Sequence, residues 1–142
     1  NELKQLLIAQ KEQIMLLNSQ AEATLKEQSL AEIALRQSDI YNKFHEAANG
    51  NGTIDSKDWE ILCTAVDHYY KDFTTRLRSI YPISDMEKKI CLLLKIGISV
   101  TGIALLTGRS KSAIVSARKK LYEKTHDETG KPEQWDAFIQ KL

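Results

Sequence analysis

The chain has 142 residues, of which 42% are hydrophobic and 27% are charged, a balance that is typical of folded globular proteins and excludes a wholly disordered chain. No apolar run approaches the ~18 residues that span a bilayer, and two cysteines are too few for a disulfide framework. We therefore expect no membrane contact from this chain. It begins at Asn1 without a methionine or a signal peptide, which indicates a fragment of a longer protein.

The net charge of +1 conceals an uneven distribution along the chain. Residues 84–124 hold 9 basic and 3 acidic residues and are net +6, whereas the flanking stretches 1–50 (5 basic, 7 acidic), 51–83 (4 basic, 5 acidic) and 125–142 (2 basic, 4 acidic) are each net negative. A basic stretch between acidic ones indicates a polyanionic partner for that stretch alone.

Residues 1–48 form the first predicted domain, a long helix with a dimerising coiled coil. This stretch contains neither glycine nor proline and is rich in good helix formers. Apolar residues recur in steps of three and four, as in a heptad seam, and the predicted dimer contacts are Leu3, Leu7, Ile14 and Leu17, followed by Ala21. We expect one unbroken helix of ~70 Å. The sequence leaves the orientation of the two chains open, although two paired binding heads favour a parallel coil.

Residues 49–83 form the second predicted domain, a loop followed by a bracing helix. A glycine-rich turn ends the long helix, and an amphipathic helix is expected from about Lys57 to Ile80, before Pro82. One face of this helix carries an apolar and aromatic stripe, which consists of Trp59, Leu62, Val66, Tyr69, Tyr70, Phe73, Leu77 and Ile80. The stripe is either a core face or, alternatively, the wall of a ligand groove.

Residues 47–58 partly match the calcium loop of EF-hand proteins. The first ligand position is Ala47, which has no side-chain oxygen, and the last is Asp58, which is short for bidentate binding. A turn capped by Asp55 or Ser56 explains the same residues without a metal. The histidines and cysteines share no metal-ligand spacing, and no phosphate loop or nucleophile motif is present. We therefore predict no metal site, no cofactor, no catalytic residue and no enzymatic activity.

Residues 84–142 form the third predicted domain, which we expect to contain three helices and an extra C-terminal helix after Pro132. Helix caps and stops divide it: a capping box at Ser84 and Glu87, N-caps at Ser99 and Ser110, and stops at Gly97 and Gly108. A short helix joined to the next by a tight turn is typical of a helix-turn-helix. Because no stretch of the chain shows period-two alternation, the predicted fold class is all α.

The helix that follows Ser110 divides into two faces. Ile114, Ala117 and Leu121 are predicted to point inward. The residues predicted to point outward are Lys111, Ser112, Val115, Ser116, Arg118, Lys119 and Tyr122. A recognition helix needs such a face, because its first turns enter the major groove while neighbouring basic residues contact phosphates. The free N–H groups at its start also favour a phosphate.

The segment GISVTGIALLTGRSKSAIVSARKKLYEK resembles the helix-turn-helix of LuxR-type transcriptional regulators. The matching positions are Gly97, Ser99, Ile103, Ala104, Ser110, Ile114, Leu121 and Lys124, whereas Gly102 stands where the family usually has glutamate. Over about residues 41–124 the chain is similar to C-terminal regulator domains common in Bacteroidetes. A sigma-factor region-four domain has nearly the same helix pattern and remains an alternative.

This resemblance implies that Val115, Ser116 and Lys119 read base edges; we assign Lys111, Arg118 and Lys120 to phosphate contacts. In such proteins the coiled coil often follows an upstream membrane helix and a sensory region. A membrane anchor in the full-length protein is therefore one expectation, with the present chain in the cytoplasm.

The predicted function is that of a sequence-specific DNA-binding transcriptional regulator, the output fragment of a larger sensor. Its expected partners are double-stranded DNA, a second copy of the chain through the N-terminal coil and, as a further candidate, RNA polymerase. The alternative is a helical protein-interaction or adaptor module whose helix-turn-helix does not bind DNA. Salt-sensitive binding to duplex DNA discriminates between the two.

Overall fold

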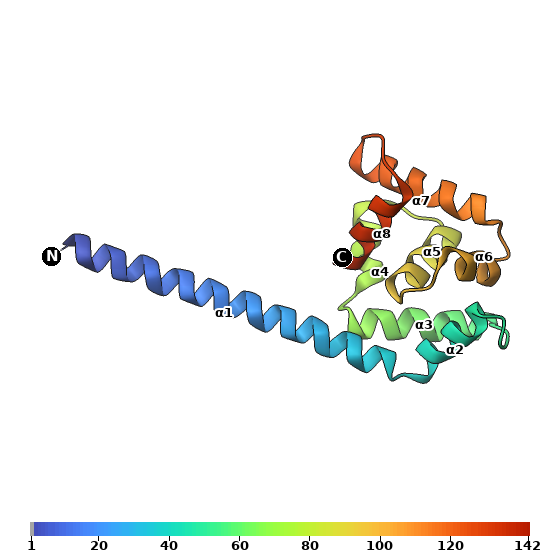
Figure 1. The fold of residues 1–142 in the computed structure, drawn as a ribbon, viewed down its shortest axis with the longest axis horizontal. Coiled ribbons are helices and arrows are strands. Elements are labelled where there is room, and N and C mark those ends of the chain that lie inside the picture. Colours follow the sequence, from blue (N-terminus) through green and yellow to red (C-terminus); the bar gives the residue numbers. More distant parts are fainter. Residues whose placement is uncertain (1) are drawn as a thin grey trace. The chain divides into compact units, whose positions relative to one another are not determined.

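A computed structural model describes residues 2–142, which are helical wherever they form regular structure (Figure 1). The helices are α1 (Glu2–Arg36), α2 (Asp39–Ala48), α3 (Ser56–Tyr69), α4 (Phe73–Ile80), α5 (Asp85–Lys95), α6 (Val100–Thr107), α7 (Lys111–His126) and α8 (Pro132–Lys141). The prediction of an all-α fold is thereby confirmed. By their internal contacts the residues fall into two units, 1–34 and 35–142.

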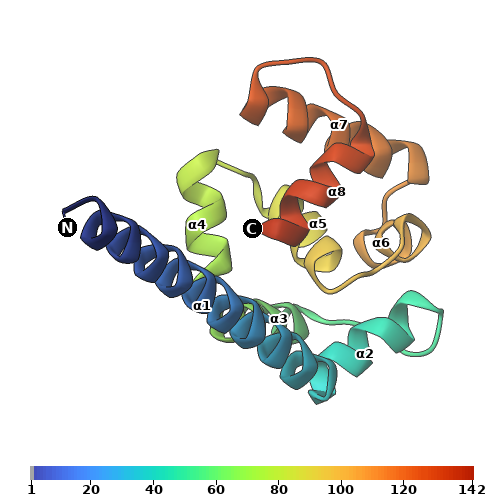
Figure 2. The same cartoon turned by 60° about the vertical axis from the view of Figure 1, so that its left-hand side comes forward.

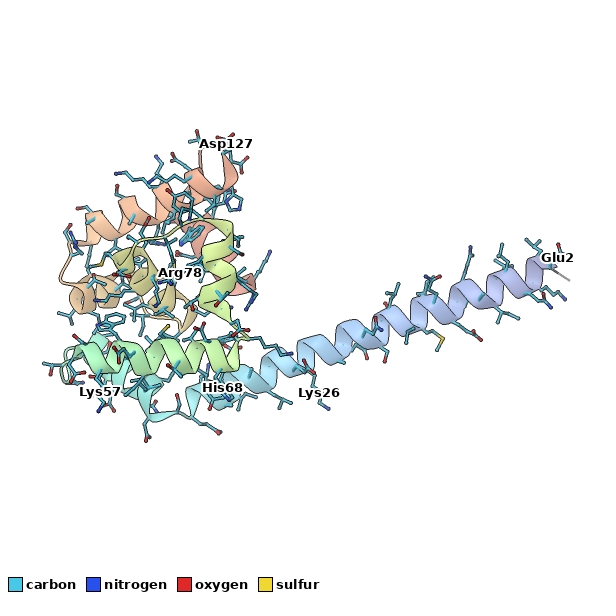
Figure 3. The ribbon with its side chains drawn as sticks, turned by 180° about the vertical axis from the view of Figure 1, so that it is seen from behind. Glu2, Lys26, Lys57, His68, Arg78 and Asp127 are labelled. Carbon is cyan, nitrogen blue, oxygen red and sulfur yellow. The ribbon has the colours of Figure 1, made fainter. Side chains whose placement is uncertain are left out.

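The first unit is the part of α1 up to Ala34, and its described side chains are exposed as far as Leu30. Figure 3 shows them projecting on all sides of the helix between Glu2 and Lys26. The large apolar ones are Leu3, Leu6, Leu7, Ile8, Ile14, Met15, Leu16, Leu17 and Leu30. They include the four predicted dimer contacts, whereas the side chain of Ala21 lies outside the described residues. Over the described part of the chain, no helix combines the length and the apolar character that crossing a bilayer requires.

The expected unbroken helix over residues 1–48 is wrong, because the chain turns at Gln37 and Ser38 before α2 begins. Ser38 has an extended backbone, and its hydroxyl caps α2 by accepting from the Tyr41 N–H at 3.4 Å. The same hydroxyl donates to the carbonyl oxygen of Leu35 at 2.6 Å. A serine side chain that bonds neighbouring backbone groups competes with the helix, which is why it caps here instead of continuing it.

The single helix expected from Lys57 to Ile80 is likewise two helices, α3 and α4. Lys71 and Asp72 between them adopt the left-handed conformation, with φ of 48° and 58°. The carboxylate of Asp67 stabilises this break by accepting from the backbone N–H of Thr74 at 2.7 Å and from its hydroxyl at 2.6 Å. The apolar residues therefore keep their three- and four-residue spacing in the sequence across the break, although they lie on two separate helices.

The core of the second unit is formed by all its helices. Its most deeply buried residues include Phe44, Leu62, Phe73, Leu93, Ile103, Ile114, Leu121, Trp135 and Ile139. Figure 2 shows α8 lying beside α7 and α5, in agreement with the contacts between these helices. The stripe on α3 and α4 packs on this core, as the first of the two interpretations expected. Its buried residues are Leu62, Val66, Phe73 and Leu77, whereas Trp59, Tyr69 and Tyr70 are half-buried and Ile80 is exposed.

Candidate nucleic-acid interface

Helices α6 and α7 are joined by a short turn whose geometry the sequence predicted. The hydroxyl of Ser99 caps α6 by accepting from the Gly102 N–H at 3.2 Å, and α6 ends at Gly108, which has a φ of 69°. Only Gly readily adopts this left-handed conformation, so the turn depends on it. The hydroxyl of Ser110 then caps α7 by accepting from the Ala113 N–H at 3.1 Å. Both N-caps and the stop at Gly108 are confirmed.

One side of α7 packs into the core and the other lies open. Ile114 and Leu121 are fully buried and Ala117 is half-buried, as predicted. The exposed side carries most of the residues that the sequence assigned to DNA: Lys111, Ser112, Val115, Ser116, Lys119 and Lys120. Hydroxyls, ammonium groups and one apolar side chain therefore share a single helix face that no other described element covers.

One ion pair and one exposed apolar side chain characterise this face. The ammonium of Lys119 lies 3.8 Å from the Glu123 carboxylate one turn later, and both side chains are exposed. An exposed pair of this kind stabilises a protein by only ~0.3–0.5 kcal/mol, so Lys119 can exchange Glu123 for a phosphate or a base at small cost. Val115 is 40% exposed, an unusual setting for an apolar side chain in the middle of a polar helix face.

The predicted outward position of Arg118 is wrong, because its side chain is buried, with 4% of the residue exposed. Its guanidinium Nε donates to Oδ1 of Asp136 at 2.8 Å, and a second N–H donates to the other carboxylate oxygen. Asp136 lies on α8, which covers this side of α7. Arg118 is therefore unavailable for a phosphate contact in this conformation, and it positions α7 against α8 instead.

Tyr122 was also expected to point outward, and it too is buried beneath the segment that follows α7, with 8% of the residue exposed. Its hydroxyl donates to the carboxylate of Glu128 at 2.8 Å, and this hydrogen bond is the main cause that raises the pKa of Tyr122 above its ordinary value. Helical periodicity gave no sign of this packing. The signal that could have indicated it is the acidic character of residues 125–142, which complements the basic helix before it.

Lys95 on α5 is another basic residue of the net-positive stretch that lies inside the protein. Its ammonium donates to the carbonyl oxygens of Ile139 and Gln140 at 3.2 and 3.1 Å, and it sits 4.4 Å from the centre of the Tyr70 ring. A cation at the carboxyl end of a helix compensates the partial negative charge of the free carbonyls there. Lys95 thus fixes the end of α8, and the charge available to a polyanion is smaller than the sequence count of +6.

Gly102, which stands where the LuxR-type pattern usually has glutamate, lies in a tight contact between two helices. A Cβ atom on this residue would lie 2.7 Å from Cγ2 of Ile98 and 2.9 Å from Cβ of Ala48. Ala48 belongs to α2, so α2 and α6 approach each other at the position where only glycine fits. A glutamate here would have to displace α2, and the sequence alone gave no indication of this contact.

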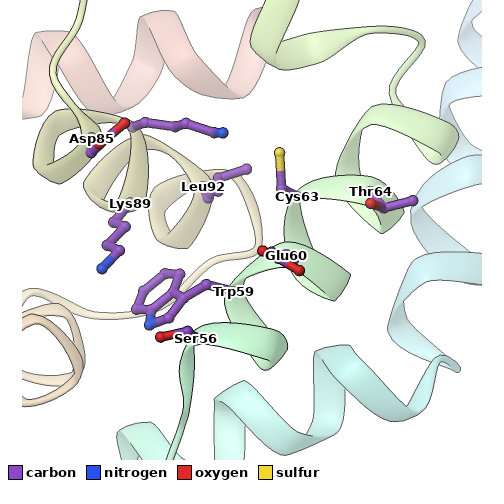
Figure 4. Close-up of a pocket in the computed structure, with 9 residues that line it drawn as sticks. Ser56, Trp59, Glu60, Cys63, Thr64, Asp85, Lys89 and Leu92 are labelled. Atoms are coloured by element: carbon purple, nitrogen blue, oxygen red, sulfur yellow. The ribbon is translucent and has the colours of Figure 1, made fainter.

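A pocket of about 670 Å³ lies between α3 and α5, and Trp59 and Lys89 stand on facing sides of it (Figure 4). The Lys89 ammonium lies 5.1 Å from the centre of the Trp59 ring, whose other contact is edge-to-face with Phe44. Carboxylates of Glu60 and Asp85 line the same pocket. Mixed charges and an already occupied aromatic face give this pocket no clear ligand preference.

The loop at residues 47–58 is held by caps and an ion pair. The carboxylate of Asp55 accepts a hydrogen bond from the Asp58 N–H at 2.9 Å, and the carboxylate of Asp58 accepts one from the Asp55 N–H at 3.0 Å. The Lys43 ammonium donates to Asp58 at 2.8 Å; that hydrogen bond is the main cause that lowers the pKa of Asp58. The capping interpretation of Asp55 is thus confirmed.

The cysteines and histidines have packing roles in the described structure. Burial raises the pKa of the Cys91 thiol to about 12, while Cys63 is half-buried and lies 3.8 Å from the Asp67 carboxylate. His126 stacks on the Tyr122 ring at 4.1 Å between centroids. Among residues 2–142, apart from the side chains that are not described, no group of three or more His, Cys, Asp or Glu residues is arranged to hold a metal ion.

No protein-family model matches the chain, and no curated protein or solved structure matches it either. The functional argument therefore depends on the geometry of α5, α6 and α7 and on the chemistry of the exposed face of α7. That face has the residue types of a nucleic-acid interface, with the exception of the buried Arg118.

Proposed function

We propose that the chain is a DNA-binding transcriptional regulator, in which α6, the turn at Gly108 and α7 form a LuxR-like helix-turn-helix. The observation that carries the proposal is the exposed face of α7, which is polar and basic while the opposite face is buried in the core. A recognition helix requires such a division, because it must be held rigidly on one side while its other side enters the major groove. In this proposal the chain binds DNA in the cytoplasm, and it neither catalyses a reaction nor needs a cofactor.

Each residue of this face has a chemical role in the proposed complex. Ser112, Ser116 and Lys119 have hydrogen-bonding groups that match base edges, and the exposed Val115 is suited to the methyl group of a thymine. Lys111 and Lys120 contact phosphates, which supply affinity without sequence information. Arg118 has no contact with DNA in this scheme; with Asp136 it fixes the orientation of α7.

The exposed apolar residues of α1 support the dimeric part of the proposal. Leu3, Leu7, Ile14 and Leu17 recur at heptad spacing and are exposed in a single chain, which favours pairing with a second copy. Two recognition helices would then address half-sites about 34 Å apart, one turn of the duplex. A membrane anchor upstream and a contact with RNA polymerase extend the proposal to the longer protein.

The test titrates the protein into fluorescently labelled 40-base-pair duplexes of random sequence at two salt concentrations. The fluorescence anisotropy of the label measures binding. The variant replaces Lys111, Lys119 and Lys120 by alanine, and the matched control replaces Lys57, Lys131 and Lys141, so both lose the same charge. We expect the first variant to weaken binding and to reduce the slope of log K against log salt by about 2 for each bound protomer, since it loses the phosphate contacts of Lys111 and Lys120 and each contributes about 0.9. Equal effects of the two triple variants would contradict the assignment of α7.

The second candidate function is a helical adaptor that binds another protein. The observation that favours it is the position of Ile8, Met15 and Leu16 on α1, which are exposed but lie off the heptad seam. A two-stranded coil leaves such residues uncovered, whereas a helical partner could bury them. Absence of binding to the duplex even at low salt would favour this function over the first.

A further inference from the structure

The loop between α2 and α3 contains two Asn-Gly pairs in succession, Asn49-Gly50 and Asn51-Gly52. All four residues are exposed, and Figure 1 shows the loop at one end of these two helices. A Cβ atom built on either glycine would have no other atom within 4 Å. The backbone of this loop therefore has open space at both glycines, and a change in its covalent structure there has room to occur.

An asparagine that precedes glycine has a side chain that can react with the backbone that follows it. The nucleophile is the backbone nitrogen of the glycine, which has no side chain to hinder its approach or to restrict its backbone angles. A hydrogen bond donated by that nitrogen opposes the reaction, because the bond must break before the nitrogen can reach the asparagine side chain. Two Asn-Gly pairs of the same sequence can therefore differ in reactivity once the chain is folded.

The two pairs of this loop differ in that hydrogen bond. The Gly50 N–H donates to the carbonyl oxygen of Ala47 at 3.0 Å, so the nitrogen that follows Asn49 is held against the end of α2. The Gly52 N–H, by contrast, donates no hydrogen bond within the part of the chain that the structure describes. Its residue has a φ of 101°, a left-handed conformation outside any helical turn. The nitrogen that follows Asn51 is therefore the more available nucleophile.

We propose that Asn51 is a site of spontaneous deamidation in the folded protein, with the backbone nitrogen of Gly52 as the nucleophile. This nitrogen gives up its proton and forms a bond to Cγ of Asn51, which closes a succinimide ring. The side-chain nitrogen of Asn51 leaves with the proton as ammonia. One water molecule then cleaves either of the two C–N bonds within the ring. The products are aspartate and isoaspartate, and no group is oxidised or reduced.

Both products change the connection between α2 and α3. The Asn51 N–H donates to the carbonyl oxygen of Glu46 at 2.9 Å, which places residue 51 at the carboxyl end of α2. A new negative charge is unfavourable there, because the free carbonyls at a helix end carry partial negative charge. The isoaspartate product also adds one methylene group to the backbone of the loop. The folded chain therefore acquires a permanent change in this loop as it ages, independently of any binding to DNA.

The test incubates the complete chain at mildly alkaline pH, where more of the backbone nitrogen is deprotonated, and digests samples briefly with trypsin at successive times. Cleavage after Lys43 and Lys57 releases residues 44–57, a single peptide that contains both pairs. Fragmentation in the mass spectrometer assigns each deamidation to residue 49 or residue 51. Asn42, which precedes a lysine, is the slow reference within the same chain.

We expect Asn51 to react about fivefold faster than Asn49 in the folded chain, since this is the factor that one net backbone hydrogen bond is worth. In urea the Gly50 hydrogen bond is lost, and the two rates should become equal. The matched variants are Asn51→Gln and Asn49→Gln, because glutamine keeps the amide but closes the larger ring far more slowly. Asn51→Gln should remove most of the deamidation of the folded chain, and Asn49→Gln should leave most of it.

Three outcomes would overturn the proposal. Equal rates at Asn49 and Asn51 in the folded chain would mean that the Gly50 hydrogen bond does not decide which pair reacts. Reaction of Asn51 in urea alone would mean that the folded loop keeps the Gly52 nitrogen away from the side chain. A rate at Asn51 no higher than that at Asn42 would show that the loop has no special reactivity.

Discussion

The two units of this chain use apolar residues in opposite ways. In α1 up to Ala34, the large apolar side chains of the described residues are exposed, whereas in residues 35–142 most of them are buried in one core. An isolated amphipathic helix gains little from its own hydrogen bonds in water and needs a partner surface. The compact unit closes its core with its own helices.

The largest expected effect is on the compact unit alone. Trp135 on α8 is fully buried beside Phe138, and Trp135→Ala should lower the free energy of unfolding by about 3–5 kcal/mol, through lost burial and the cavity that remains. Urea denaturation followed by circular dichroism measures it. The half-buried Trp59→Ala is the control and should cost clearly less. Equal losses would mean that α8 contributes little to the core.

The second effect concerns α1 alone and compares two isoleucines of nearly equal exposure. Ile14 (58% exposed) belongs to the heptad seam, and Ile8 (57%) lies off it. Ile14→Asp should weaken self-association about 100-fold because it buries a charge between the helices. Ile8→Asp should leave association nearly unchanged. Sedimentation velocity over a concentration series measures both, and similar behaviour of the two variants would rule out the assigned seam.

A smaller effect tests the contact between α7 and α8. Asp136→Ala leaves the buried guanidinium of Arg118 without its carboxylate, which should cost about 2 kcal/mol, less than a fully buried pair because the Asp136 side chain is partly exposed. Arg118→Met combined with Asp136→Ala should restore most of that loss. The measurement is a double-mutant cycle by urea denaturation, and strictly additive losses would show that the pair is uncoupled.

The smallest effect is a pH dependence located at the loop between α2 and α3. The folded-state pKa of Asp58 lies below its ordinary value of 3.8, chiefly because Lys43 donates a hydrogen bond to it. The carboxylate therefore contributes stability that is fully present above that value and is lost as the pH falls through the lowered pKa. Asp58→Asn should reduce the loss of thermal midpoint that occurs as the pH falls below the ordinary pKa of 3.8. An unchanged pH dependence of the midpoint below that value would exclude Asp58 as its source.

Local signals in the sequence predicted the parts of the fold that local chemistry decides. The capping box at Ser84, the caps at Ser99 and Ser110 and the left-handed Gly108 all depend on residues within a few positions of one another. The buried face of α7 followed from helical spacing, since Ile114 and Leu121 are two turns apart. These features could be predicted because their cause lies within one helix or one turn.

The missed features have causes far apart in the sequence. Arg118 is buried because Asp136 on another helix lies beside it, and Gly102 is required because Ala48 approaches from α2. The break at Ser38 is capped locally by the serine hydroxyl, and Leu35 just before it is buried in the core of residues 35–142. Helix propensity gives no information on which helices meet.

The burial of Lys95 and Arg118 has a consequence for the unfolded chain. Both cations are inside the folded protein, and unfolding would return them to water, where a polyelectrolyte can bind them. A flexible polyanion such as heparin would then find two more cations in residues 84–124 of the unfolded chain than on the folded surface. Since a ligand that prefers the unfolded state lowers apparent stability, polyphosphate-rich surroundings favour opening of this unit.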